Sequence, residues 1–129
     1  MKNYPHLNEL ENFINAIEKE NLKLILLFGS LAIGTYTQRS DIDVLCVYDK
    51  EFTDRRERFL QSYKYSEGLV QPKTITFSEL KKNLLQGNSF LHHIFSEGYI
   101  LYNTIPERQL RKWRERGKKK VNVTYSPPF

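Results

Sequence analysis

Two carboxylates one residue apart are the first feature of the sequence that could do chemistry. Asp41 and Asp43 open an apolar run that continues to Tyr48, and this pattern predicts a strand over residues 41–49. Alternation along a strand places both carboxylates on one face and Ile42 on the other. Adjacent carboxylates repel each other unless a cation lies between them. Mg²⁺ commonly takes one or two carboxylates together with phosphate oxygens, so the pair predicts a Mg²⁺ (or Mn²⁺) site.

A glycine–serine pair supplies the second candidate feature. Gly29 and Ser30 follow an apolar run, and ten residues separate Ser30 from Asp41. Glycine lets the backbone approach a ligand closely, and a helix starting at Ser30 would offer free N–H groups to a phosphate. Alone, a Gly-Ser pair is most often a turn, and Asp-x-Asp is most often a solvated strand start. Their conjunction at this spacing indicates a nucleoside triphosphate bound through Mg²⁺.

The Gly-Ser pair, the ten-residue spacing and Asp41-Ile42-Asp43 resemble the signature of the minimal nucleotidyltransferases, a family of the DNA polymerase beta superfamily. Similarity to its small, antitoxin-like prokaryotic members extends over residues 7–103, in the segments 70–72, 77–80, 87–88 and 98–102. The resemblance implies a polymerase-beta-like nucleotidyltransferase fold. It also implies that Gly29 and Ser30 bind the triphosphate while both aspartates hold the divalent metals and are the catalytic residues. Arg39 and Ser40, directly before Asp41, are further candidates for nucleotide binding.

A third carboxylate is the feature that this sequence lacks. Active family members usually carry it on the next strand, where it helps to activate the nucleophile. The corresponding position, just before Pro72, is Gln71, and a neutral amide can neither act as a base nor neutralise a second Mg²⁺. Glu67 is the nearest acid upstream, and it shares the strand face only if the strand extends past Gly68. Two hypotheses follow: an active transferase, or a non-catalytic protein of the same fold that binds nucleotide or a partner.

The resemblance also implies a protein partner. Small members of the family pair with HEPN-domain proteins in toxin–antitoxin systems, in which the nucleotidyltransferase is the antitoxin and attaches AMP to its partner. ATP is therefore the expected donor. The predicted function is Mg²⁺-dependent transfer of a nucleoside monophosphate, AMP above all, from a nucleoside triphosphate to a protein or other hydroxyl acceptor.

Positive charge is concentrated near the C-terminus. The net charge is +5, and within residues 107–120 eight basic residues face two acidic ones. A basic segment on a near-neutral body favours an acidic partner surface or nucleic acid, here through residues 108–120. The alternative interpretation is a solvated helix with no binding role.

Length and composition limit the class of protein. The 129 residues suit one domain, with the nucleotidyltransferase part at 1–105 and a basic helix and tail at 106–129. No apolar run reaches the roughly 18 residues of a membrane span, and the first ten residues lack the apolar region of a signal peptide. The single cysteine, Cys46, lies in an apolar run and is expected to be buried. These features favour a cytoplasmic protein without a membrane contact.

Apolar periodicity predicts an α/β fold with a small mixed β-sheet flanked by helices. The strand at 22–28 is continuously apolar and should be central, whereas Pro72 favours an edge position for its strand. Ser78 is expected to cap a helix that runs to Leu85, and Gly117 to end the basic helix. The expected helices are 6–20, 31–36, 52–63, 78–85, 89–97 and 106–117, and the expected strands are 22–28, 41–49, 69–77 and 99–102.

Overall fold

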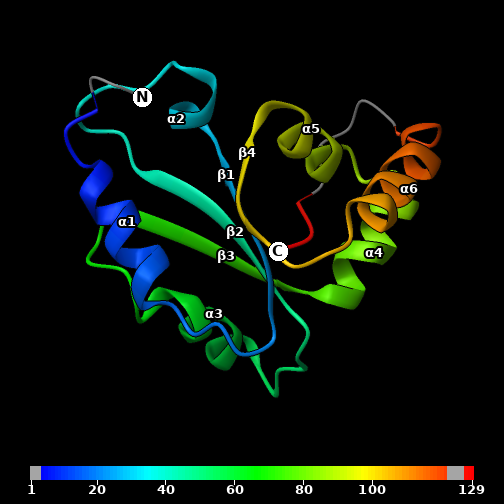
Figure 1. Ribbon diagram of the computed structural model, residues 1–129, viewed down its shortest axis with the longest axis horizontal. Coiled ribbons are helices and arrows are strands. Elements are labelled where there is room, and N and C mark those ends of the chain that lie inside the picture. Colours follow the sequence, from blue (N-terminus) through cyan, green and yellow to red (C-terminus); the bar gives the residue numbers. More distant parts are fainter. Residues whose placement is uncertain (1–3, 122–126) are drawn as a thin grey trace.

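A four-stranded sheet forms the centre of the molecule, with helices on both of its faces (Figure 1). The computed structural model describes residues 4–121 and 127–129. The strand order is β3-β2-β1-β4; β1 pairs antiparallel with β2 and β4, and β2 pairs parallel with β3. The sheet is therefore mixed, as predicted. Its strands are β1 (Leu22–Phe28), β2 (Ile42–Tyr48), β3 (Val70–Thr76) and β4 (Tyr99–Asn103).

Six helices lie around the sheet in the described part of the chain. The helices α1 and α3 cover one face, and α4, α5 and α6 cover the other (Figure 1). The short helix α2 follows β1 directly. Their bounds are α1 (Leu7–Ala16), α2 (Ser30–Ile33), α3 (Arg55–Tyr63), α4 (Phe77–Leu85), α5 (Ser89–Glu97) and α6 (Glu107–Lys118). None of the described helices is long and apolar enough to cross a membrane.

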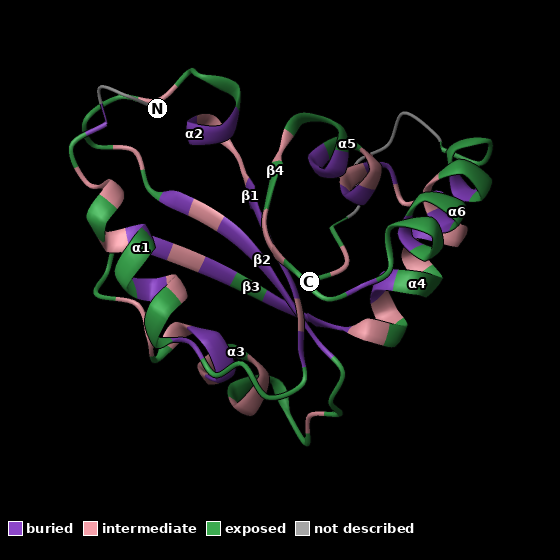
Figure 2. Ribbon diagram, viewed as in Figure 1, coloured by how far each residue is buried: buried purple, intermediate pink, exposed green. Residues whose placement is uncertain are grey.

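Coverage on both faces explains the continuous apolar runs of β1 and β2. In β1, Ile25 and Leu27 belong to the core under α1, whereas Leu24 and Leu26 belong to the core under α4–α6. Both strands are almost wholly buried, whereas exposed residues lie on the helices, in the loops and on the edge strand β4 (Figure 2). The central position predicted for β1 and the edge position predicted for the strand of Pro72 are both confirmed.

The alternation along β2 decides where its carboxylate lies. Leu45 and Val47 pack in the core under α4–α6, and Val44 and Cys46 pack in the core under α1. Since side chains alternate between faces, Asp43 starts the series that faces α4–α6. Burial raises the pKa of the Cys46 thiol to about 12, so this cysteine is a small buried hydrophobe and no nucleophile.

The predicted cap of the helix expected at 78–85 differs from the structure. The cap of α4 is Thr76, because its hydroxyl accepts from the backbone N–H of Glu79 at 3.1 Å and the Glu79 carboxylate accepts from the N–H of Thr76 at 2.8 Å. This reciprocal pair satisfies two backbone donors at once. The prediction of Ser78 as the cap was wrong by two residues.

The predicted role of Gly117 was also wrong. Helix α6 continues through Gly117 to Lys118, and Gly117 is buried. A Cβ at this position would overlap the carbonyl oxygen of Leu84 and lie 2.8 Å from Nε2 of His92. A glycine stands here because α6 passes very close to α4 and α5.

Candidate nucleotide-binding site

The two parts of the predicted motif meet at the end of β1. Phe28, the last residue of β1, is the register partner of Asp43, the second residue of β2. Gly29 has φ 77°, a left-handed conformation that favours glycine. A Cβ on Gly29 would overlap Oδ2 of Asp43 and lie 3.2 Å from its Cγ. The backbone of Gly29 therefore lies directly against the Asp43 carboxylate.

The negative charge of the Asp43 carboxylate is only partly compensated by neighbouring positive charge. Its carboxyl group is half-buried, and burial raises its pKa above the ordinary value, with a further raising contribution from the nearby Asp41 carboxylate. The positive charge of Lys73 acts in the opposite direction on this pKa but does not cancel the rise. A cation bound between the two carboxylates would relieve both the burial cost and the repulsion.

Asp41 lies one residue before the strand. The prediction that the strand begins at residue 41 was off by one, since β2 begins at Ile42, whose N–H donates to the carbonyl oxygen of Leu69 at 2.9 Å. Asp41 is exposed, whereas Ile42 is fully buried on the opposite side. The carboxylates of Asp41 and Asp43 still interact electrostatically, so an exposed and a half-buried carboxylate together border the site.

A turn holds the loop at residues 37–40, which carries the nucleotide-binding candidates Arg39 and Ser40. The N–H of Thr37 donates to Oγ of Ser40 at 2.8 Å, and the N–H of Arg39 donates to Oγ1 of Thr37 at 3.2 Å. The Ser40 oxygen thus closes the turn. Arg39 is exposed and makes no ion pair with the described residues. Nucleotide binding by Arg39 and Ser40 stays a prediction.

Tyr4 fixes this loop and was not predicted. Its buried side chain donates to the carbonyl oxygen of Ser40 at 2.5 Å and packs edge-on against Tyr36, with ring centroids 5.7 Å apart. Burial raises the pKa of Tyr4, and Glu9 and Asp41 raise it further. Tyr4 lies far from the motif in sequence, so no local pattern indicates this contact.

Gln71 stands directly beside Asp43. The two residues are register partners in the parallel pair β2–β3. The Gln71 amide donates from Nε2 to the carbonyl oxygen of Gly68 at 2.7 Å. Glu67 is exposed and lies outside β3, which begins at Val70, so the strand does not carry it onto the face of Asp43. At the strand position next to Asp43, a neutral amide takes the place of a carboxylate.

Lys73 is a site residue that the sequence reasoning missed. It follows Gln71 by two residues in β3, so both side chains lie on the face of Asp43. Its positive charge lowers the pKa of Asp43, and it is exposed at the edge strand. The spacing of two from Gln71 is the signal that could have identified it.

The carboxylates of Asp41 and Asp43 suit a metal ion that binds together with a phosphate-bearing substrate. Among the residues that the structure describes, no group of three or more His, Cys, Asp and Glu side chains could hold a metal ion. Mg²⁺ is usually bound by one or two carboxylates together with substrate phosphates and water. Asp41 and Asp43 fit one such ion, whereas Gln71 adds no charge for a second.

Comparison with known proteins agrees with this geometry. A family model described as "Nucleotidyltransferase domain" matches residues 7–98, most of the chain. A protein of Methanocaldococcus jannaschii with the name "Putative protein adenylyltransferase" is 34% identical over 99 residues, which cover 72% of this chain and 94% of that protein.

Solved structures share the fold at low sequence identity. A toxin–antitoxin structure with AMP-PNP has a TM-score of 0.56 at 20% identity, over 87% of this chain and 83% of that one. A Sulfolobus solfataricus structure described as "a putative nucleotidyltransferase" has a TM-score of 0.51 at 19% identity, over 75% and 76% of the two chains. A Shewanella oneidensis complex of a tri-AMPylated HEPN toxin with an MNT antitoxin has a TM-score of 0.50 at 18% identity, over 87% and 80%.

Proposed function

Because the chain belongs to the nucleotidyltransferase domain family, as a minimal nucleotidyltransferase, we propose that it transfers AMP from Mg²⁺-bound ATP to a hydroxyl group of a protein. The observation that carries this proposal is the contact between the Gly29 backbone and the Asp43 carboxylate, with Asp41 close enough to raise the Asp43 pKa. This arrangement puts the Gly-Ser turn and two acidic oxygen donors at one point.

Each residue has a distinct part in the proposed reaction. Ser30, at the start of α2, holds the terminal phosphates, and Gly29 allows the triphosphate to approach the strand ends. Asp41 and Asp43 would hold Mg²⁺ (or Mn²⁺). When bound, this ion neutralises phosphate charge and stabilises the leaving diphosphate. Lys73, on the face of Asp43, would add positive charge beside the α-phosphate.

The transfer itself is a substitution at the α-phosphorus. The acceptor oxygen forms a bond to phosphorus, the bond to the β-phosphate oxygen breaks, and diphosphate leaves. The acceptor proton must also be removed. The neutral amide of Gln71 cannot accept it, so in this proposal the proton goes to solvent.

The identity of Gln71 sets an expected rate. General-base catalysis typically contributes about 10²–10⁴-fold, so a site without the third carboxylate is expected to be slow. The alternative is a binding protein of the same fold that retains nucleotide and does not transfer it. The two hypotheses differ in one observable, the covalent attachment of the nucleotide.

We further propose a HEPN-domain protein as partner and acceptor. Structures with the same fold include a complex of an MNT antitoxin with a tri-AMPylated HEPN toxin, and the M. jannaschii relative carries the name of a protein adenylyltransferase. Nucleic acid as a second partner of residues 108–120 stays a prediction from their charge.

The test uses the four α-labelled nucleoside triphosphates. Each is incubated with the protein, Mg²⁺ and a lysate of the source cells, with EDTA and Asp43→Asn controls. Label from ATP in one protein band, absent in both controls, is the expected result and identifies the acceptor. Nucleotide binding without any transfer would favour the binding protein and overturn the transferase proposal.

A further inference from the structure

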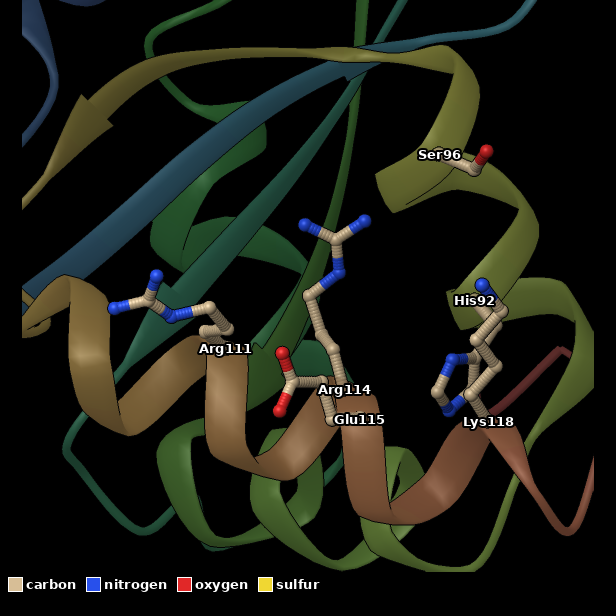
Figure 3. A pocket seen from close by; sticks show the side chains of 6 residues that line it. All are labelled: His92, Ser96, Arg111, Arg114, Glu115 and Lys118. Carbon is tan, nitrogen blue, oxygen red and sulfur yellow. The ribbon is translucent and has the colours of Figure 1, made fainter.

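A cavity between α5 and α6 lies apart from the residues discussed so far. It has a volume of about 310 Å³, and neither of the candidate metal ligands lines it. Helix α6 contributes four of its residues and α5 contributes two (Figure 3). The lining residues are His92, Ser96, Arg111, Arg114, Glu115 and Lys118.

The packing of the helices fixes the walls of this cavity. Gly117 lets α6 pass against the Leu84 carbonyl at the end of α4. Nε2 of His92 lies 2.8 Å from the same carbonyl oxygen, and since that oxygen can only accept, Nε2 carries the proton. His92 is thereby held in place at one end of the cavity.

Two cations point from α6 toward α5. Arg114 and Lys118 are four residues apart and therefore lie on one side of the helix. Figure 3 shows both side chains extending toward α5, whereas Arg111 points away from it. The guanidinium carbon of Arg114 lies 5.5 Å from the ring centroid of Phe95, which holds it at the cavity wall.

The positive charge at the cavity is not neutralised by ion pairs. Among the described residues, the ion pairs are Lys50–Glu57 and Arg58–Glu79, and neither involves the cavity. Glu115 is the one acidic residue in the lining, against three basic ones. The formal lining charge is therefore +2, with His92 counted as neutral.

We propose that this cavity is a binding site for a small phosphate-bearing dianion, with a diphosphate group as its best ligand. A water molecule occupies about 30 Å³ of liquid, so the cavity has room for about ten waters. The nine non-hydrogen atoms of a diphosphate fill such a space, and its charge complements the lining. Arg114 can donate two parallel hydrogen bonds to phosphate oxygens, and Lys118 can supply a mobile ammonium donor. Ser96 can donate its hydroxyl proton to a further phosphate oxygen, whereas His92, whose one N–H is used by Leu84, forms part of the wall.

This site is independent of the proposed transfer reaction. The ligand could be free diphosphate or the diphosphate end of a nucleoside diphosphate, since both present the same group. Metal is not required, because the cavity itself is cationic. EDTA therefore removes binding through Asp41 and Asp43 and leaves binding at the cavity.

Calorimetric titration of the whole protein tests the proposal. Inorganic diphosphate and UDP are titrated separately in EDTA, at constant ionic strength held with chloride. One saturable site is expected, and the Arg114→Gln/Lys118→Gln variant should weaken it by about tenfold or more, which corresponds to about 1.4 kcal/mol. The exposed single variant Lys118→Gln tests the same point with less risk to folding. Binding of UDP with no binding of inorganic diphosphate would contradict a site for the diphosphate group itself.

The matched control is Arg108→Gln/Lys112→Gln. It removes the same charge from exposed positions of the same helix outside the cavity, and binding should stay within about twofold of the wild type. Equal weakening by this control would show general attraction to a basic helix and overturn the proposal. The absence of saturable diphosphate binding would also overturn the proposal, even if an RNA oligonucleotide bound to the protein.

Discussion

Gly29 meets two demands that an alanine cannot meet together. Its φ of 77° lies in the left-handed region, and its missing Cβ leaves space for the Asp43 carboxylate. Gly29→Ala is expected to lower the free energy of unfolding by about 1–3 kcal/mol from backbone strain and to abolish nucleotide transfer by displacing Asp43. Chemical denaturation and label transfer measure the two effects.

Gly34→Ala is the matched control. Gly34 has a similar φ of 82°, but a Cβ there would meet nothing within 4 Å. This variant should lose a similar stability while it retains transfer. If Gly29→Ala transferred as well as Gly34→Ala, the close approach to Asp43 would have no functional meaning.

Asp43 makes the metal-free protein sensitive to pH. Burial and Asp41 raise its folded pKa above the ordinary value of an aspartate, so the folded state holds the proton more tightly than the unfolded state. The ionised group therefore destabilises the fold above its folded pKa, and this penalty vanishes below the unfolded pKa. In EDTA at pH 7, Asp43→Asn should melt higher than the wild type, and the difference should disappear as the pH falls below about 4. A wild type that melts higher at pH 7 would contradict this account.

Gln71→Glu tests the missing third carboxylate. The new carboxylate would stand beside Asp43, so it should destabilise the metal-free protein through repulsion and the loss of the hydrogen bond to Gly68. That hydrogen bond contributes about 0.5–1.5 kcal/mol. With Mg²⁺ and ATP, transfer should rise by about tenfold or more, as measured by initial rates. If both Gln71→Glu and Gln71→Ala transferred at the wild-type rate, this position would take no part in catalysis.

At the scale of elements, α6 is a docked part of the fold. Leu110 and Trp113 are buried, and Gly117 lies against the Leu84 carbonyl. Gly117→Ala should therefore lower the free energy of unfolding by about 1–3 kcal/mol, through overpacking. At an open helical position the same change stabilises by about 0.4–1 kcal/mol, so a stabilised variant in urea denaturation would contradict close docking.

Most elements could be predicted because their signals are strong and local. Continuous apolar character identified β1 as central, and Pro72 identified β3 as an edge. Gly117 was misread since a helix end and a close approach both select glycine. Thr76 was missed because Thr76 and Ser78 are both suitable caps, and only the position of Glu79 distinguishes them. The role of Gly117 depends on neighbours in space, whereas the Thr76–Glu79 spacing of a capping box is present in the sequence.

In the candidate site too, some contacts could be predicted from the sequence and others could not. The proximity of Gly29 and Asp43 follows from a short insert between adjacent strands, so the spacing predicts it. Lys73 could have been identified by its spacing of two from Gln71, whereas Tyr4 reaches its loop across 36 residues of sequence. A tertiary contact such as that of Tyr4 is not visible in a single sequence.

At the scale of the whole molecule, the net positive charge and the proposed catalytic carboxylates lie in different regions. Residues 107–120 carry the net positive charge, whereas the remaining residues include 12 basic and 13 acidic ones. The acidic site formed by Asp41 and Asp43 lies on other elements, at the start of β2. A positive helix on a near-neutral body attracts anionic ligands and acidic surfaces over a distance set by the salt concentration.

The most direct measurement of the central claim compares ATP labelled at the α-phosphate with ATP labelled at the γ-phosphate. The purified protein, its acceptor and Mg²⁺ are incubated with each, beside Asp43→Asn. The account predicts that only the α-label becomes covalently attached, that an equal amount of diphosphate is released, and that Asp43→Asn attaches none. Attachment of the γ-label, or of the α-label by Asp43→Asn at the wild-type rate, would contradict it.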